Sequence, residues 1–127
     1  MGKKVIYTEK LAKPVAPYSQ ATLAGNTLFI AGTVATNSKG EIVGKGDIKA
    51  QTRQTLENIK AVIEAVGGTM RDVTRTTVYL TDFSNYAGMN EVYKTYFPSD
   101  PPARATVRAD LVSPDFLIEI EATAVLG

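Results

Sequence analysis

Residues 117–126 read LIEIEATAVL, and this stretch decides how the chain folds. Apolar residues occupy alternate positions, and Glu119, Glu121 and Thr123 stand between them. Side chains of a strand alternate between its two faces, so the pattern predicts a strand with one apolar and one polar face. The apolar face needs a covering layer of helices.

The preceding segment, residues 103–109 (ARATVRA), is a second predicted strand, joined to the first through a Ser-Pro-Asp turn. Arg104, Thr106 and Arg108 alternate there with alanine and valine. The apolar residues suit packing against helices. We therefore expect Arg104 to lie on the charged face of its strand, as Glu119 does on the other.

Two segments upstream have the apolar spacing of helices. Asp47 can cap a helix that runs to about Val66 and stops at Gly67-Gly68. A second helix is expected from about Ser84 to Tyr96, and the prolines that follow end it.

Three further segments, residues 4–7, 27–34 and 73–80, are rich in strand-forming residues. Two helices separated by a strand, with strands before and after, predict an α+β fold: one mixed sheet with both helices on the same face. No repeat or linker divides the sequence, so residues 1–127 are expected to form a single domain. The other sheet face is either solvated, the simpler interpretation, or meets polar faces of further subunits.

Composition narrows the possible partners. The 127 residues carry a formal net charge of +1, from 14 basic and 13 acidic side chains. No overall field therefore draws the chain toward nucleic acid or an anionic membrane. No stretch is long and apolar enough to span a membrane or to act as a signal peptide, and we expect a cytoplasmic protein.

The chain contains neither histidine nor cysteine. This excludes Ser-His-Asp and Cys-His catalysis, and the imidazole and thiolate ligands on which zinc and most transition-metal sites rely. Carboxylates, Arg, Lys, Tyr, hydroxyls, backbone groups or bound water must carry any reaction. We expect no metal site.

Two motifs resemble those of the RidA/YjgF family of enamine and imine deaminases. Residues 101–107 (PPARATV), followed by 117–122 (LIEIEA), resemble the family's C-terminal signature, and 16–20 (APYSQ) resembles its Gly-Pro-Tyr-Ser-Gln motif. The resemblance covers essentially the whole chain. It implies a chorismate-mutase-like fold and a homotrimer, whose sheets close into a central barrel with three clefts between the subunits.

Arg104 and Glu119 are the principal candidate residues. The planar guanidinium of Arg104 can hold a carboxylate by two parallel hydrogen bonds, which a lysine cannot do. An ion pair or plain exposure is the simpler interpretation, and the resemblance implies substrate anchoring. Without histidine, a glutamate is the strongest general acid/base candidate, and the pattern leaves Glu119 and Glu121 open. The resemblance assigns water activation to Glu119 and a structural role to Glu121.

The resemblance adds five further positions. It implies that Tyr18 orients substrate or water, where the simpler interpretation is a ring that holds a loop. It implies backbone contacts to substrate from Gly32 and Thr106. Asn90 either binds ligand or caps backbone groups. Ala31 stands where deaminating members often have a serine, so water positioning is expected to be weaker.

The expected reaction is hydrolysis of 2-enamino or 2-imino acids, such as 2-aminoacrylate, to 2-keto acids and ammonia. Arg104 would clamp the carboxylate, while Glu119 and Tyr18 position a water that attacks the imine carbon; neither metal nor organic cofactor is required. One alternative, favoured by Ala31 and Thr33, is a trimeric binding or chaperone-like protein without efficient turnover. Another, an RNA-cleaving translation inhibitor, is disfavoured by the neutral charge and the missing histidine.

Overall fold

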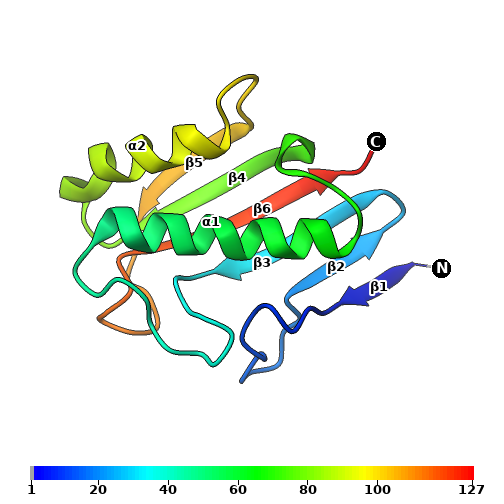
Figure 1. The fold of residues 1–127 in the computed structure, drawn as a ribbon, viewed down its shortest axis with the longest axis horizontal. Coiled ribbons are helices and arrows are strands. Elements are labelled where there is room, and N and C mark those ends of the chain that lie inside the picture. Colours follow the sequence, from blue (N-terminus) through cyan, green and yellow to red (C-terminus); the bar gives the residue numbers. More distant parts are fainter. Residues whose placement is uncertain (1) are drawn as a thin grey trace.

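The computed structural model describes residues 2–127 as a six-stranded sheet with two α-helices lying across one face (Figure 1). The strands are β1 (Lys3–Ile6), β2 (Ala21–Ala24), β3 (Thr27–Thr33), β4 (Val73–Leu80), β5 (Ala103–Arg108) and β6 (Ile118–Val125). The helices are α1 (Ile48–Ala65), α2 (Tyr86–Tyr96) and the short 3-10 helices η1 (Met70–Asp72) and η2 (Phe83–Asn85). The predicted α+β fold, with both helices on one face, is confirmed.

The strand order is β1-β2-β3-β6-β4-β5. Neighbouring strands are antiparallel except β4 and β5, which are parallel and are joined through α2. The sheet is therefore mixed, as predicted. The last strand in the chain, β6, lies between β3 and β4 near the centre of the sheet, which explains the strict alternation of residues 117–126.

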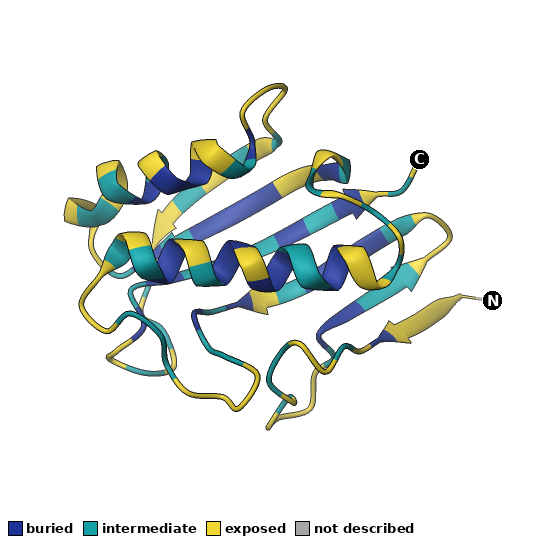
Figure 2. Cartoon of the chain, viewed as in Figure 1, coloured by how far each residue is buried: buried dark blue, intermediate teal, exposed yellow. Residues whose placement is uncertain are grey.

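The core lies between α1 and the central strands. Leu56, Ile59 and Ile63 of α1 are fully buried, as are Ile118 and Ile120 of β6. In Figure 2 the dark blue, buried segments follow the inner side of α1 and run along the strands behind it. Burying one such side chain stabilises the fold by about 1.5–3 kcal/mol, so this stripe holds the helix on the sheet.

The predicted limits of α1 are confirmed. The Asp47 side chain accepts a hydrogen bond from the Ala50 amide at 3.1 Å and caps the first turn. The helix stops before Gly67. The φ of this residue is 82°, a left-handed conformation that glycine adopts without the strain a residue with a side chain would have. Neither α1 nor any other helix within residues 2–127 is long and apolar enough to cross a membrane.

The structure corrects two expectations. Strand β2 was missed because it has only four residues and two of them are alanine, too short a pattern for periodicity to reveal. The second α-helix begins at Tyr86 rather than near Ser84. The Asp82 side chain accepts from the Ser84 amide at 2.8 Å, and this cap starts the single turn of η2 instead.

Candidate active site

Arg104 lies on the edge strand β5, and its side chain is on the helix side of the sheet. The parallel register places it beside Thr76 of β4. The Thr76 hydroxyl is 2.7 Å from the hydroxyl of Tyr93 on α2, so this row of side chains points toward the helices. Arg104 therefore projects toward α2.

Neutral groups of α2 hold the Arg104 guanidinium. One terminal nitrogen donates to Asn90 Oδ1 at 2.8 Å and the other to the Tyr86 hydroxyl at 3.1 Å. The guanidinium carbon also lies 4.8 Å from the ring centroid of Tyr93, a cation–π contact. Burial raises the pKa of Tyr93, although the Thr76 hydrogen bond and the Arg104 charge oppose this.

No carboxylate neutralises this cation in the part of the chain that the structure describes, since the ion pairs there join Lys45 with Asp115 and Lys49 with Glu91. Arg104 is thus oriented by neutral groups and has no ion-pair partner among the described residues. Such a group suits an external anion, above all a carboxylate. The sequence left open whether Asn90 binds ligand or caps backbone groups; in the structure its side chain orients Arg104.

Arg104 borders two hollows. One, of about 510 Å³, is lined by Phe83, Tyr86, Arg104 and Thr106. The other, of about 380 Å³, is lined by Asn90, Tyr93, Lys94, Phe97, Pro101, Pro102 and Arg104. Thr106, a predicted site residue, therefore lies on the same side as Arg104.

Glu119 lies on the opposite face of the sheet. It stands between Ile118 and Ile120, which are fully buried beneath the helices, so its side chain points away from them. The half-buried carboxylate lies over Gly32 of β3, where a Cβ atom would overlap Glu119 Oε2. Gly32 and Ala31 fall where the β3–β6 register shifts, between Ile30 and Thr33, and form a β-bulge.

The carboxylates of Glu119 and Glu121 have different surroundings. Burial, and then the charge of Glu121, raise the pKa of Glu119. No hydrogen bond within residues 2–127 engages the Glu119 carboxylate, whereas Glu121 accepts one from the Tyr79 hydroxyl at 2.5 Å. Of the two carboxylates, Glu119 is thus the one with neither oxygen in a hydrogen bond among the described residues.

Tyr18 and Ala31 lie on the Glu119 side. Both line a hollow of about 360 Å³, which residues of β1, β2 and β3 also line. The Tyr18 side chain is exposed, and the Ala31 amide donates to the Gln20 carbonyl at 3.0 Å, which fixes the backbone of the bulge.

The predicted site residues thus form two groups. Arg104, Asn90 and Thr106 lie on the helix side, and Glu119, Tyr18, Ala31 and Gly32 lie on the other face or at the bulge beside it.

The expectation that Arg104 points away from the helices, as Glu119 does, is wrong. On the edge strand β5 the exposed Ala105 and Val107 point away from the helices instead. Helix α2, which covers Arg104, presents tyrosine and asparagine side chains to it. A polar side chain on β5 can therefore lie on the helix side of the sheet as well as on the face without helices.

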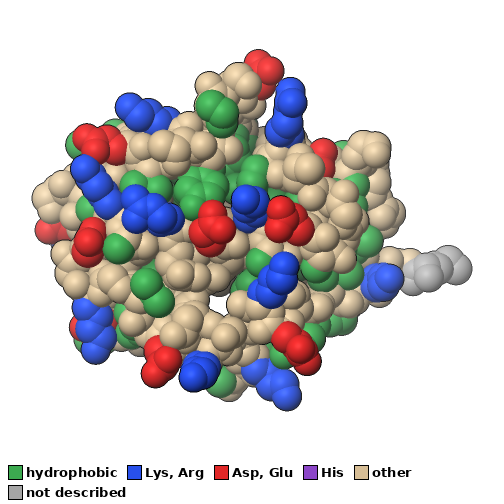
Figure 3. Space-filling view, in the orientation of Figure 1, with side chains coloured by type: hydrophobic (Ala, Val, Ile, Leu, Met, Phe, Trp, Pro, Cys, Tyr) green, Lys and Arg blue, Asp and Glu red, His purple; other side chains and the backbone are tan. Residues whose placement is uncertain are grey.

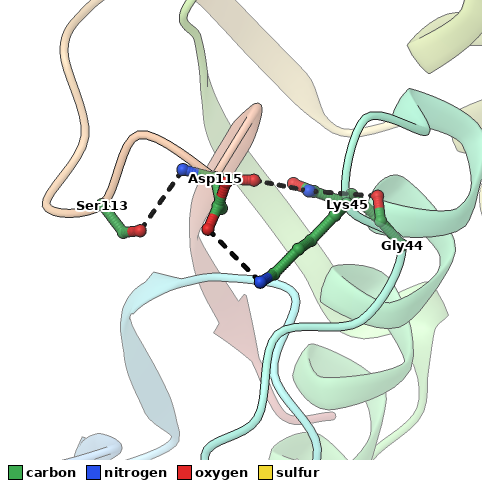
Figure 4. A network of polar contacts seen from close by, with 5 residues as sticks. Gly44, Lys45, Ser113 and Asp115 are labelled. Carbon is green, nitrogen blue, oxygen red and sulfur yellow. Dashed lines mark hydrogen bonds and ion pairs between the residues drawn. The ribbon is translucent and has the colours of Figure 1, made fainter.

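A buried glutamine positions the segment that leads into β6. The fully buried Gln51 of α1 donates to the Asp115 carbonyl at 2.8 Å and to the Gly44 carbonyl at 3.2 Å, and accepts from the Leu117 amide at 2.8 Å. Lys45 adds an exposed ion pair to Asp115 at 3.5 Å (Figure 4). Glu119 follows two residues after Leu117, so Gln51 anchors the start of the strand that carries it.

Residues 8–126 match the family profile described as Endoribonuclease L-PSP. A RutC family protein of Pyrococcus horikoshii is 57% identical over 123 residues, which cover 96% of this chain and 97% of that protein. The crystal structure of RidA from the Antarctic bacterium Psychrobacter sp. superposes with a TM-score of 0.90 at 37% identity, over 97% of this chain and 99% of that one. The YjgF gene product from E. coli gives a TM-score of 0.88 at 37% identity, over 96% and 98%.

This chain belongs to the RidA/YjgF family. The resemblance seen in the sequence motifs is therefore confirmed, and so is the fold that it implied. The names of these three relatives state no reaction, and the family profile is named after an endoribonuclease.

Sequence reasoning assigned no role to two tyrosines that contact Arg104. Tyr86 and Tyr93 lie with Asn90 at helical spacing, on one side of α2, and all three reach the guanidinium. Their helical spacing could be seen in the sequence. Their contact with Arg104 could not, because it depends on the parallel pairing of β4 with β5, which brings Arg104 beneath α2.

Proposed function

We propose that this RidA/YjgF protein is an enamine/imine deaminase, which hydrolyses 2-enamino and 2-imino acids of the 2-aminoacrylate type to 2-keto acids and ammonia in the cytoplasm. The observation that carries the proposal is the state of Arg104. Its guanidinium is oriented by Asn90, Tyr86 and Tyr93, borders open hollows, and has no carboxylate partner within residues 2–127. Such a cation is prepared for a substrate carboxylate.

In the proposed reaction Arg104 binds the substrate carboxylate, and an enamine first tautomerises to its imine. Glu119 and Tyr18 position a water molecule, and Glu119 accepts its proton as the oxygen attacks the imine carbon. Glu119 returns this proton to the nitrogen, which gives a carbinolamine. Glu119 then moves the proton of the new hydroxyl to the same nitrogen, the C–N bond breaks, and ammonia departs while the C–O bond becomes the carbonyl of the 2-keto acid. The electrophilic C=N bond is already present in the substrate. Backbone groups of Gly32 and Thr106 are proposed to contact the bound acid.

The proposal requires more than one subunit. Strand β4 lies between β5 and β6, so two strand spacings of about 4.8 Å separate the backbones of Arg104 and Glu119. Their side chains also leave opposite faces of the sheet. We propose a homotrimer in which Arg104 of one subunit meets Glu119 of the next, across clefts at the edge strand β5. The half-exposed Phe29 and Val107, on the face without helices, support burial against further copies.

The deciding experiment generates 2-aminoacrylate in situ from serine or cysteine and measures keto-acid release above the spontaneous rate. Arg104→Ala is expected to lower kcat/KM by about 100-fold or more, since it removes hydrogen bonds to a charged group. Arg104→Lys keeps the charge and should recover only part of the loss. Arg108→Ala, an exposed arginine on the same strand, is the matched control. Equal rates for wild type and Arg104→Ala would rule out the deaminase.

The same assay separates two alternatives. A ligand-binding or chaperone-like protein would bind a carboxylate through Arg104 without accelerating hydrolysis, and Ala31, which lacks a hydroxyl, favours this possibility. The name of the family profile favours RNA cleavage. Against it, Figure 3 shows basic and acidic side chains interspersed over the helix face, unlike the basic stripe of a nucleic-acid footprint. Salt-dependent RNA binding with cleavage would support that alternative.

A further inference from the structure

Two glutamates and a tyrosine form a cluster on the sheet face without helices. Glu119 and Glu121 are two residues apart on β6, so their backbones are about 7 Å apart and their side chains share a face. Tyr79 of β4 is paired with Glu119 in the register, yet its hydroxyl donates to Glu121 Oε1 at 2.5 Å. The tyrosine thus reaches diagonally across the strand pair, past the nearer glutamate.

This hydrogen bond gives the two carboxylates different properties. The same bond to Glu121 is the main cause that raises the pKa of Tyr79, so the phenol remains a donor at neutral pH. One oxygen of Glu121 is therefore occupied.

We propose, on the basis of the proposed deaminase function, that Tyr79 and Glu121 are a positioning pair. Tyr79 holds Glu121 by a hydrogen bond and keeps it turned aside, and this leaves Glu119 to exchange a proton with water and substrate. The sequence pattern left the two glutamates equivalent, and Tyr79 is the group that distinguishes them.

Within its own subunit, few other titratable groups surround Glu119, and the proposed trimer would add Arg104 of the next subunit. Glu121 shares β6, and Tyr79 projects from β4. Arg75 lies further along β4 and borders a small cavity of about 80 Å³ beside Glu121. Strand β3 contributes no titratable group, and Tyr18 belongs to the segment before β2. The negative charge of Glu121 is thus the nearest one able to oppose ionisation of Glu119.

The sign of the expected effect follows from this arrangement. Burial and the Glu121 charge both raise the pKa of Glu119. If Glu119 acts as a base, activity falls as the pH drops through that pKa. Removal of the Glu121 charge should lower the Glu119 pKa and move the acidic limb of kcat/KM to lower pH.

The test compares pH profiles of kcat/KM for the wild type and five variants. Glu119→Gln is expected to lose about 100-fold or more, as a missing general base does. Glu121→Gln should retain activity within about tenfold and move the acidic limb to lower pH. Tyr79→Phe should alter the limb in the wild-type background but not in the Glu121→Gln background, because its effect passes through Glu121. Glu64→Gln, an exposed glutamate on α1, is the charge-matched control.

A measurement without substrate separates the inference from the reaction. Carboxyl carbon NMR titration of glutamate-labelled protein, assigned with the Glu119→Gln variant, should show the Glu119 pKa falling in Glu121→Gln. If this occurs without any deaminase activity, the pairing holds and the proposed function fails. If the protein is active but neither the NMR titration nor the acidic limb moves, the pairing is overturned. Equal inactivity of Glu121→Gln and Glu119→Gln, both folded by circular dichroism, would also overturn it.

Discussion

The Glu119 carboxylate lies directly against the backbone of Gly32. A Cβ atom at position 32 would overlap Glu119 Oε2 and would lie 2.9 Å from Glu119 Cδ. Side chains do not tolerate such distances, so the bulge in β3 and the missing side chain together make room for the carboxylate.

Gly32→Ala should therefore displace Glu119 and lower deaminase activity. A misplacement of about 1 Å can reduce a rate by about 100-fold, and a loss of that order is expected in kcat. Gly127→Ala, where nothing lies within 4 Å of the added atom, is the control. Full activity of Gly32→Ala would show that the Glu119 carboxylate does not act from this position.

Ala31→Ser should increase turnover. The substitution adds a hydroxyl to the lining of the hollow that Tyr18 also lines, where it can hold a water. Since loss of one oriented donor can cost about 100-fold in rate, a gain of up to that order in kcat is expected. An unchanged kcat in the 2-aminoacrylate assay would mean that water is positioned without this hydroxyl.

Phe29→Asp should separate the subunits. Phe29 is 50% exposed on the sheet face without helices, and a charge there would oppose burial against another copy. Light scattering should report a folded monomer, and the assay should report no deaminase activity. Val112→Asp is the control, because Val112 is exposed in the loop after β5. A stable and fully active monomer would contradict the shared site.

Glu119→Gln should raise the stability of the fold at neutral pH. The pKa of Glu119 is higher in the folded state than in the unfolded state. The protonated carboxyl therefore contributes its full stabilisation at a pH below the pKa of the unfolded state, and this stabilisation is lost as the pH rises through the pKa of the folded state. The variant's advantage in Tm should be larger at pH 7 than near pH 4. Glu64→Gln, which changes an exposed glutamate on α1, is the control. If Glu119→Gln is less stable at pH 7, the carboxylate has a stabilising partner.

Gln51→Leu should destabilise the protein strongly. It leaves two carbonyls and one amide without their buried partner, at a cost of about 2–4 kcal/mol. Lys45→Ala, which breaks only the exposed ion pair with Asp115, should cost about 0.5 kcal/mol or less. Chemical denaturation measures both, and similar losses would contradict the anchoring role of Gln51.

Local patterns predicted most elements of the fold correctly. Helix α1 was predicted from Asp47 and the glycine stop, because caps act within a single turn. Strand β6 was predicted from alternation, because a strand at the sheet centre packs one face against the helices. Strand β2 was too short for its residues to show a period. The two faces of β5 were predicted the wrong way round, because the α2 side chains that contact Arg104 are polar and not apolar.

The sequence by itself determined the element types, the missing imidazole and thiol chemistry, and Arg104 and Glu119 as the residues to examine. Only the tertiary structure decided that these two side chains leave opposite faces of one sheet, that α2 orients Arg104, and that Gly32 and Tyr79 shape the surroundings of the glutamates. The physical reason is the range of the interactions. Periodicity reports a residue's own strand or helix, whereas pairing between strands distant in sequence decides which side chains meet.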